Sequence, residues 1–138
     1  MIFKEEKKNL FEVDDKYLLA HCISADYALG AGIATIFQKV YHLKNNLKIV
    51  GKKRYPDCIF INPVFNLVTK EKYWHKPTYQ SLQRSLEMMK KMLPKDKLNY
   101  IAMPKIGCGL DGLQWSRVKE IIEEVFKDIN IEILICYL

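Results

Sequence analysis

The sequence predicts an α/β fold, a three-layer α/β/α domain in which helices cover both faces of a central mixed β-sheet. Apolar, β-rich runs alternate along the chain with segments whose apolar residues recur at helical spacing. In the middle, the strand-like runs 58–61 and 65–69 flank Asn62-Pro63, a turn signal that closes an antiparallel hairpin. With 138 residues and 49% hydrophobic content, the chain is long enough for one core and short for two, so we expect a single domain over 1–138.

The first half of the chain begins with a strand and a helix. The apolar run 17–23 is the expected strand, and after Leu29-Gly-Ala-Gly-Ile-Ala34 a helical segment should end near Tyr41. The next segment is ambiguous. Leu47-Lys-Ile-Val50, followed by the basic stretch 51–56, fits a frayed strand, a helix end or a basic loop.

The second half alternates helix and strand. Residues 77–93 carry an apolar stripe at spacings of three and four, with Pro77 suited to the first turn of the helix. Residues 99–103 form an apolar strand, 114–126 a second amphipathic helix, and 131–138 a final buried strand. This order completes the alternation that a layered fold requires.

Composition limits the classes of function. The net charge of +6 favours polyanionic partners, nucleotide or nucleic acid, but arginine occurs only at positions 54, 84 and 117, which gives little support to a base-reading surface. Residues 1–8 lack a signal peptide's apolar core, and no apolar run approaches the roughly 18 residues of a membrane span. The four cysteines form no CxxC pair, as is typical of a reduced intracellular chain. We expect a soluble cytoplasmic monomer with no membrane partner.

Two glycine-rich loops follow predicted strands. One spans Gly30–Ala34 and the other Gly107–Gly112, each shortly before a helix. Glycine permits left-handed backbone and close approach, and the free N–H groups at a helix start favour an anion. One such loop alone is an ordinary connection between a strand and a helix. Two such loops suggest a binding site for a pyrophosphate at the carboxyl ends of the strands.

Five sequence elements occur in order over residues 10–138. They are His21-Cys-Ile-Ser24, Gly30-Ala-Gly-Ile-Ala34, Thr69-Lys70, His75-Lys-Pro-Thr-Tyr79 and Pro104-Lys-Ile-Gly-Cys-Gly-Leu-Asp111. Together they resemble a macrodomain, and the Gly-Cys-Gly-Leu-Asp element with the following Leu-Gln-Trp is similar to the branch of terminal ADP-ribose protein glycohydrolases. The resemblance implies a macrodomain fold and an ADP-ribose cleft.

The resemblance also implies which residues bind ADP-ribose. They are Asn9, Leu10, Ser24, Gly30, Ala31, Gly32, Ile33, Ala34, Thr69, Ile106, Gly107, Cys108, Gly109 and Leu110. Two positions depart from the usual macrodomain pattern. Ser24 stands where many members carry an asparagine that touches the distal ribose, which is typical of the terminal-glycohydrolase branch. Asn9 replaces the usual acidic residue that recognises the adenine amino group, although an amide oxygen can still accept from that group.

Lys70 is by composition one of 22 basic residues, in the charged run 70–76. The resemblance implies that it attacks the anomeric carbon of the distal ribose and forms a transient lysyl-ADP-ribose adduct. That role requires a neutral amine, so burial or nearby cations must disfavour the ammonium form. Lys72 and Lys76 are candidates for that repulsion.

The role of Asp111 has two interpretations. Gln114 follows three residues later, the spacing of a capping box, so from spacing alone Asp111 is a helix cap. The resemblance implies instead that Asp111 is catalytic, as a general base at the scissile ribose that helps water resolve the adduct.

The predicted function is hydrolysis of terminal mono-ADP-ribose from acidic protein side chains, with Lys70 and Asp111 catalytic and with neither metal nor cofactor. Three alternatives stay open: removal of ADP-ribose from nucleic-acid bases, deacylation of O-acetyl-ADP-ribose, and a reader that binds ADP-ribose without turnover. His21, His42 and His75 lack the spacing of a zinc site. Cys108 fits a small residue in a tight loop better than a nucleophile.

Overall fold

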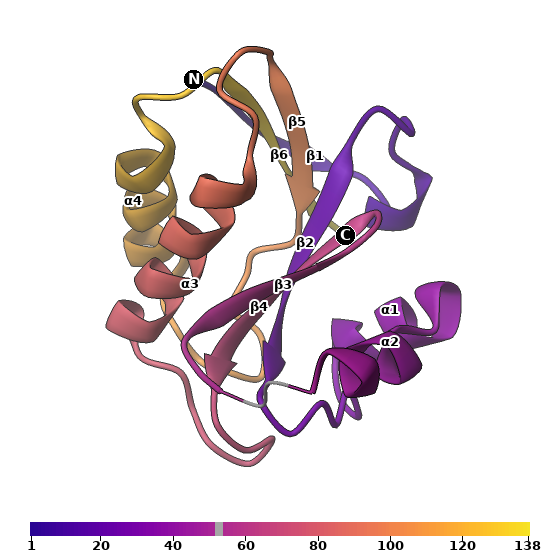
Figure 1. The fold of residues 1–138 in the computed structure, drawn as a ribbon. Helices are drawn as coiled ribbons and strands as arrows, with labels where there is room; N and C mark the ends of the chain where they lie inside the picture. Colours follow the sequence, from indigo (N-terminus) through magenta and orange to yellow (C-terminus); the bar gives the residue numbers. More distant parts are fainter. Residues whose placement is uncertain (52–53) are drawn as a thin grey trace.

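A computed structural model describes residues 1–51 and 54–138, and its six strands form one mixed sheet (Figure 1). The strands are β1 (Ile2–Lys7), β2 (Leu18–Ser24), β3 (Asp57–Ile61), β4 (Val64–Lys70), β5 (Asn99–Met103) and β6 (Ile131–Tyr137). Their order across the sheet is β1-β6-β5-β2-β4-β3. Every neighbouring pair is parallel except the hairpin β3–β4, which is antiparallel as predicted.

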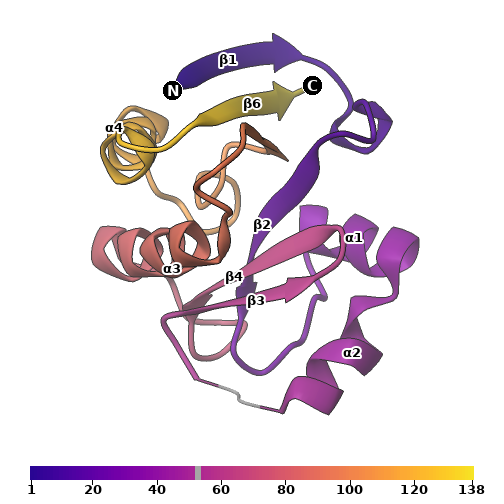
Figure 2. The same ribbon diagram turned by 45° about the horizontal axis from the view of Figure 1, so that its top comes forward.

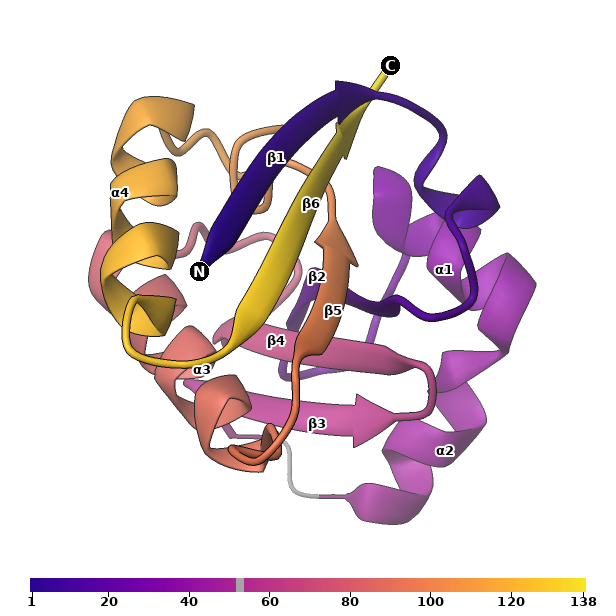
Figure 3. The same ribbon diagram turned by 90° about the horizontal axis from the view of Figure 1, so that it is seen from above.

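Helices cover both faces of the sheet, which confirms the three-layer prediction (Figures 1 and 3). Helices α1 (Ile33–Tyr41) and α2 (Leu43–Val50) lie on one face, and α3 (Tyr79–Met92) and α4 (Trp115–Phe126) lie on the other. Strand alternation divides the core accordingly. In β2, Leu19 packs in the cluster with α1 and α2, whereas Ala20 packs in the cluster with α3 and α4.

Helix α2 resolves the ambiguity at residues 47–50. Leu43 and Leu47, one turn apart, are fully buried and hold this helix against the sheet. His42 in left-handed conformation separates α2 from α1. Of the basic stretch 51–56, residues 52 and 53 lie outside the described part of the chain.

Strand β1 was not predicted. It pairs in parallel with β6 at the sheet edge, beside the C-terminal strand in Figure 2. Five of its six residues are exposed, and Lys4-Glu5-Glu6-Lys7 contains no apolar residue. An edge strand of charged residues discourages pairing with other chains and lacks the apolar alternation that would reveal it in a sequence.

Two predictions at helix starts were wrong: Pro77 in the first turn of α3 and Asp111 as the cap of α4. Thr78 is the N-cap of α3, where its hydroxyl accepts from the Ser81 N–H, so Pro77 precedes the helix instead of occupying its first turn. Helix α4 begins at Trp115 with Gln114 as its N-cap. Asp111 therefore lies three residues outside the capping position, and the capping-box interpretation fails.

Candidate active site

A cleft of about 930 Å³ lies where β2, β4 and β5 end. Its walls come from three loops, which follow these strands and precede α1, α3 and α4. In Figure 1, β2 and β4 both run to the lower end of the sheet, where the first two loops begin. Because parallel strands deliver their following loops to one edge, residues far apart in the sequence meet there.

The two glycine-rich loops touch each other. Gly32 has φ +59°, and a Cβ on it would lie 3.4 Å from Cδ1 of Leu110 in the second loop. Gly107 has φ +72°, and a Cβ there would lie 2.9 Å from Cδ1 of Leu113. Both positions thus favour glycine because of their left-handed backbone conformation. The loops enclose one wall of the cleft with main-chain atoms.

Lys70 and Asp111 meet at this cleft. The Nζ of Lys70 donates to Oδ1 of Asp111 over 2.7 Å, and the two side chains are 15% and 16% exposed. Both line the cleft. An amine and a carboxylate in direct contact and largely shielded from solvent can exchange a proton and act on the same substrate atom.

A register shift at the end of β4 places Lys70. Ile23 pairs with Val68, but the next residue of β2, Ser24, pairs with Lys70, so Thr69 is the extra residue of a bulge. The carbonyl oxygen of Lys70 accepts from the N–H of Ala25 over 2.9 Å. A bulge disrupts the side-chain alternation locally, and Lys70, the residue after it, lines the cleft.

Asp26 links the loop after β2 to the loop after β4. Its Oδ1 accepts from Ser24 Oγ at 2.5 Å and from the Ala28 N–H at 3.2 Å, and its Oδ2 accepts from the Tyr73 N–H at 3.0 Å. Burial alone would raise the pKa of Asp26, but these hydrogen bonds and the nearby charge of Lys72 lower it below its ordinary value. The ionised carboxylate therefore fastens the loop that follows Lys70.

The cations expected to repel Lys70 have other neighbours. Lys76 donates to the carbonyl oxygen of Leu110, and Lys72 acts on the carboxylate of Asp26. The Lys70 amine instead makes an attractive contact, its hydrogen bond to Asp111.

Most of the expected binding residues line the cleft. Ser24, Gly30, Ala31, Gly32, Ile33, Ala34, Ile106, Gly107, Gly109 and Leu110 surround it together with Lys70 and Asp111. Four do not. Asn9 caps a short helix, η1 (Leu10–Glu12), by accepting from the Phe11 N–H, and Leu10 is buried in the α1 and α2 side of the core. Thr69 lines a neighbouring cavity, and Cys108 packs against the core on the α3 and α4 side.

The structure adds cleft residues that the sequence did not single out, among them Leu29, Tyr73 and Lys105, and it places Trp74 at the cleft as well. Tyr73 and Trp74 are 62% and 63% exposed and meet edge to face. Leu29 has φ +49°, which is rare for a non-glycine residue. A large aromatic pair within a charged run is the one signal that could have marked part of this set.

Thiol chemistry has little support at this site. Burial, and then the charge of Asp111, raise the pKa of the Cys22 thiol to about 12, and burial raises that of Cys108. Protonated thiols are poor nucleophiles.

Across residues 1–51 and 54–138, no three His, Cys, Asp or Glu side chains gather as metal ligands would. Nor does any helix in those residues have the length and apolar character to cross a membrane.

Comparison with known proteins identifies relatives. A family model described as Macro domain matches residues 46–122. The chain is 42% identical over 132 residues to the ADP-ribose glycohydrolase OARD1 of Homo sapiens, a match that covers 94% of this chain and 87% of that protein. The Bos taurus protein of the same name is 41% identical over the same shares of the two chains.

Solved structures share the fold. The macrodomain of Thermus aquaticus DarG matches with a TM-score of 0.82 at 20% identity and covers 99% of both chains. Thermosipho africanus DarTG, solved in complex with ADP-ribose, matches with a TM-score of 0.69 at 17% identity, over 98% of this chain and 41% of that one. At these identities, the likeness is one of fold.

Proposed function

Because this chain belongs to the macrodomain family, we propose that it is an ADP-ribosyl hydrolase that removes terminal ADP-ribose from acidic protein side chains through a lysyl-ADP-ribose intermediate. The ADP-ribose glycohydrolases among its relatives support the class of reaction. The observation that carries the proposal is the 2.7 Å contact between Nζ of Lys70 and Oδ1 of Asp111 at the cleft.

The diphosphate of ADP-ribose fits the wall formed by the two glycine-rich loops. Main-chain N–H groups there can approach an anion closely because Gly32 and Gly107 carry no side chain, and α1 begins directly after Gly32. Lys76 and Lys105 line the same cleft and add positive charge. A volume of about 930 Å³ is suited to a dinucleotide-sized ligand, since small-molecule sites span about 300–1,000 Å³.

In the first chemical step, the Lys70 ammonium gives a proton to Asp111, whose Oδ1 already accepts its hydrogen bond. The amine then forms a bond to the anomeric carbon of the distal ribose. The bond from that carbon to the acyl oxygen breaks, and its electron pair leaves with the glutamate or aspartate as a carboxylate. The adduct now carries a secondary ammonium, and Asp111 releases its proton to solvent.

In the second step, water replaces the lysine nitrogen at the same carbon. Asp111, ionised again, takes a proton from the water as the new carbon–oxygen bond forms and the carbon–nitrogen bond breaks. Asp111 passes this proton to the departing amine, which restores the ammonium–carboxylate pair. The overall reaction consumes one water and releases ADP-ribose, a protein carboxylate and one proton.

The experiment measures release of ADP-ribose from protein modified on glutamate, from modified DNA and from O-acetyl-ADP-ribose. Wild type should hydrolyse the glutamate-linked protein, and Lys70→Ala should not. Lys91→Ala, at an exposed lysine of α3 that lines neither cavity, serves as the control and should retain activity. Binding of ADP-ribose without release from any substrate would identify a reader instead, and release only from DNA would identify a nucleic-acid substrate.

A further inference from the structure

A second cavity of about 530 Å³ adjoins the cleft. Lys70 and Lys76 line both spaces, and the remaining walls of the second come from the loop after β4, the first turns of α3 and residues 55–56 before β3. We infer that this acceptor cavity binds carboxylates that neighbour the modified residue, so that the enzyme prefers acidic segments of ADP-ribosylated proteins. The inference rests on the proposed function, because it assigns the cavity to the protein part of that substrate.

Position is the first support. A side chain attached to the sugar at Lys70 lies at the boundary between the cleft and the acceptor cavity, since Lys70 belongs to both. The nucleotide part occupies the cleft in the proposed function. The peptide that continues from the modified side chain then has a preformed space beside it, large enough for a few side chains.

Charge is the second support. Arg84 is exposed on α3 and forms no ion pair with any described residue. Lys76 donates to the neutral carbonyl oxygen of Leu110 and so keeps its charge uncompensated by that contact. Among the described residues that line the cavity, Glu71 is the one carboxylate. The walls therefore present an excess of positive charge to whatever enters.

Oriented donors are the third support. Nδ1 of His75 accepts from the Lys72 N–H over 3.2 Å, so the neutral ring carries its proton on Nε2 and offers it as a donor. Thr78 and Ser81 line the cavity and form the capping box of α3, a helix of 14 residues. The positive end of that helix dipole thus faces the same space. Carboxylates match both features.

The same walls fit a nucleic acid poorly. Proteins that hold single strands stack successive bases on several aromatic side chains. Of the described cavity-lining residues, Tyr55 is the one Phe, Tyr or Trp. A space of this size with one such ring suits a short acidic peptide better than a run of bases.

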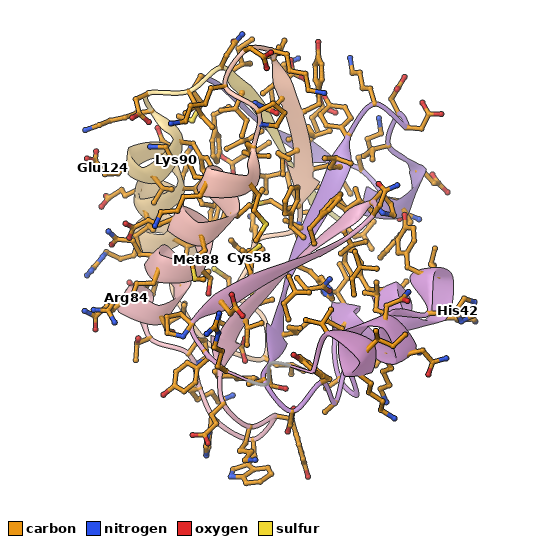
Figure 4. All side chains as sticks on the ribbon, in the orientation of Figure 1. His42, Cys58, Arg84, Met88, Lys90 and Glu124 are labelled. Atoms are coloured by element: carbon orange, nitrogen blue, oxygen red, sulfur yellow. The ribbon has the colours of Figure 1, made fainter. Side chains whose placement is uncertain are left out.

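The experiment compares two synthetic peptides, each with ADP-ribose on one glutamate. One carries Asp or Glu on both sides of that residue, and the other carries Ser and Gly. Their ratio of kcat/KM, acidic over neutral, is measured for wild type, Arg84→Gln and Lys91→Gln. The two variants lose the same charge from the same helix face, two turns apart, and Figure 4 shows Arg84 on the part of α3 away from Lys90.

Wild type should prefer the acidic peptide by about fivefold, as expected for one partly exposed ion pair, and salt should reduce the preference. Arg84→Gln should bring the ratio close to one, and Lys91→Gln should leave it unchanged. Equal use of both peptides by wild type, an equal change in both variants, or an Arg84-dependent preference for a modified oligonucleotide over both peptides would overturn the inference.

Failure of the proposed function has a different signature. If wild type hydrolyses neither peptide, that function is wrong, and the same ratio is then taken from the dissociation constants of the two peptides. An acidic preference in binding that depends on Arg84 supports the acceptor cavity, and equal binding refutes it.

Discussion

Lys70 and Asp111 stand 41 positions apart in the sequence and share a hydrogen bond of 2.7 Å. Neither lies on a regular part of its element. Lys70 follows the bulge at Thr69, and Asp111 lies in the glycine-rich loop before α4. Two local departures from regular structure thus bring an amine and a carboxylate together beside the cleft.

Asp111→Asn should separate binding from chemistry. The amide oxygen can still accept from Lys70, but it cannot take the proton that the first step transfers. We expect kcat for glutamate-linked ADP-ribose to fall by about 100- to 10,000-fold, the usual size of a general-base contribution. Affinity for ADP-ribose, measured by calorimetry, should change little. Asp128→Asn, at an exposed partner of Lys90, is the control and should keep full activity.

Gly107→Ala should destabilise the fold, because φ at this position is +72° and the new Cβ would lie 2.9 Å from Leu113 Cδ1. Strain of this kind costs about 1–3 kcal/mol in free energy of unfolding, measured in urea. Gly109→Ala is the matched control, since a Cβ there meets no described atom within 4 Å. Equal stability of the two variants would contradict the role assigned to Gly107.

The sequence predicted the sheet and most of its helices, because apolar periodicity records which face of an element is buried. Helices α3 and α4 carry clear apolar stripes, and β2 and β5 are apolar runs bounded by glycine-rich loops. Strand β1 escaped prediction because its charges protect a sheet edge and leave no alternation.

The contact between Lys70 and Asp111 was not predictable from local pattern. Spacing favoured a capping role for Asp111 and gave no reason to select Lys70 among 22 basic residues. The bulge at Thr69 has no sequence signature, and the loop contacts of Asp26 join residues 47 positions apart. Only the family resemblance pointed to the pair. Local periodicity carries no information about which loops meet at the sheet edge.

Asp26→Asn should loosen the loop that follows Lys70. In wild type, one carboxylate oxygen accepts from Ser24 and Ala28, and the other accepts from Tyr73. In the variant, the amide nitrogen replaces one of these oxygens and faces hydrogen-bond donors with a donor of its own. We expect a loss of about 1–3 kcal/mol in free energy of unfolding. Limited proteolysis should cut the 71–78 loop faster than in wild type. An unchanged cleavage rate would show that Asp26 does not hold this loop.

Stability should fall in mild acid because of His21. The ring is fully buried, stacks on Phe37 and donates from Nε2 to Oδ1 of Asn66, whose amide nitrogen is already committed to main-chain carbonyls. Burial lowers the pKa of His21 from 6.5 to about 4, even though the contact with Asn66 acts in the opposite direction. Between about pH 4 and pH 6.5, the unfolded chain therefore binds a proton at His21, whereas the folded chain leaves this ring neutral.

The direction of this change in stability with pH follows from the linkage between proton binding and folding. A lowered histidine pKa leaves stability intact above pH 6.5 and removes it as the pH falls toward 4, by up to about 1.4 kcal/mol per pH unit. Urea unfolding at several pH values checks the slope. His21→Gln should reduce it, whereas His42→Gln, at an exposed histidine, should retain it. The same slope in both variants would exclude His21 as its source.

The intermediate itself offers the sharpest test. Asp111→Ala should still permit attack by a fraction of neutral Lys70 but should slow the entry of water, so the adduct should accumulate. After incubation with glutamate-linked ADP-ribose, peptide mass spectrometry should find ADP-ribose covalently attached to Lys70. Attachment to a different lysine, or hydrolysis by Lys70→Ala at the wild-type rate, would contradict covalent catalysis by this residue.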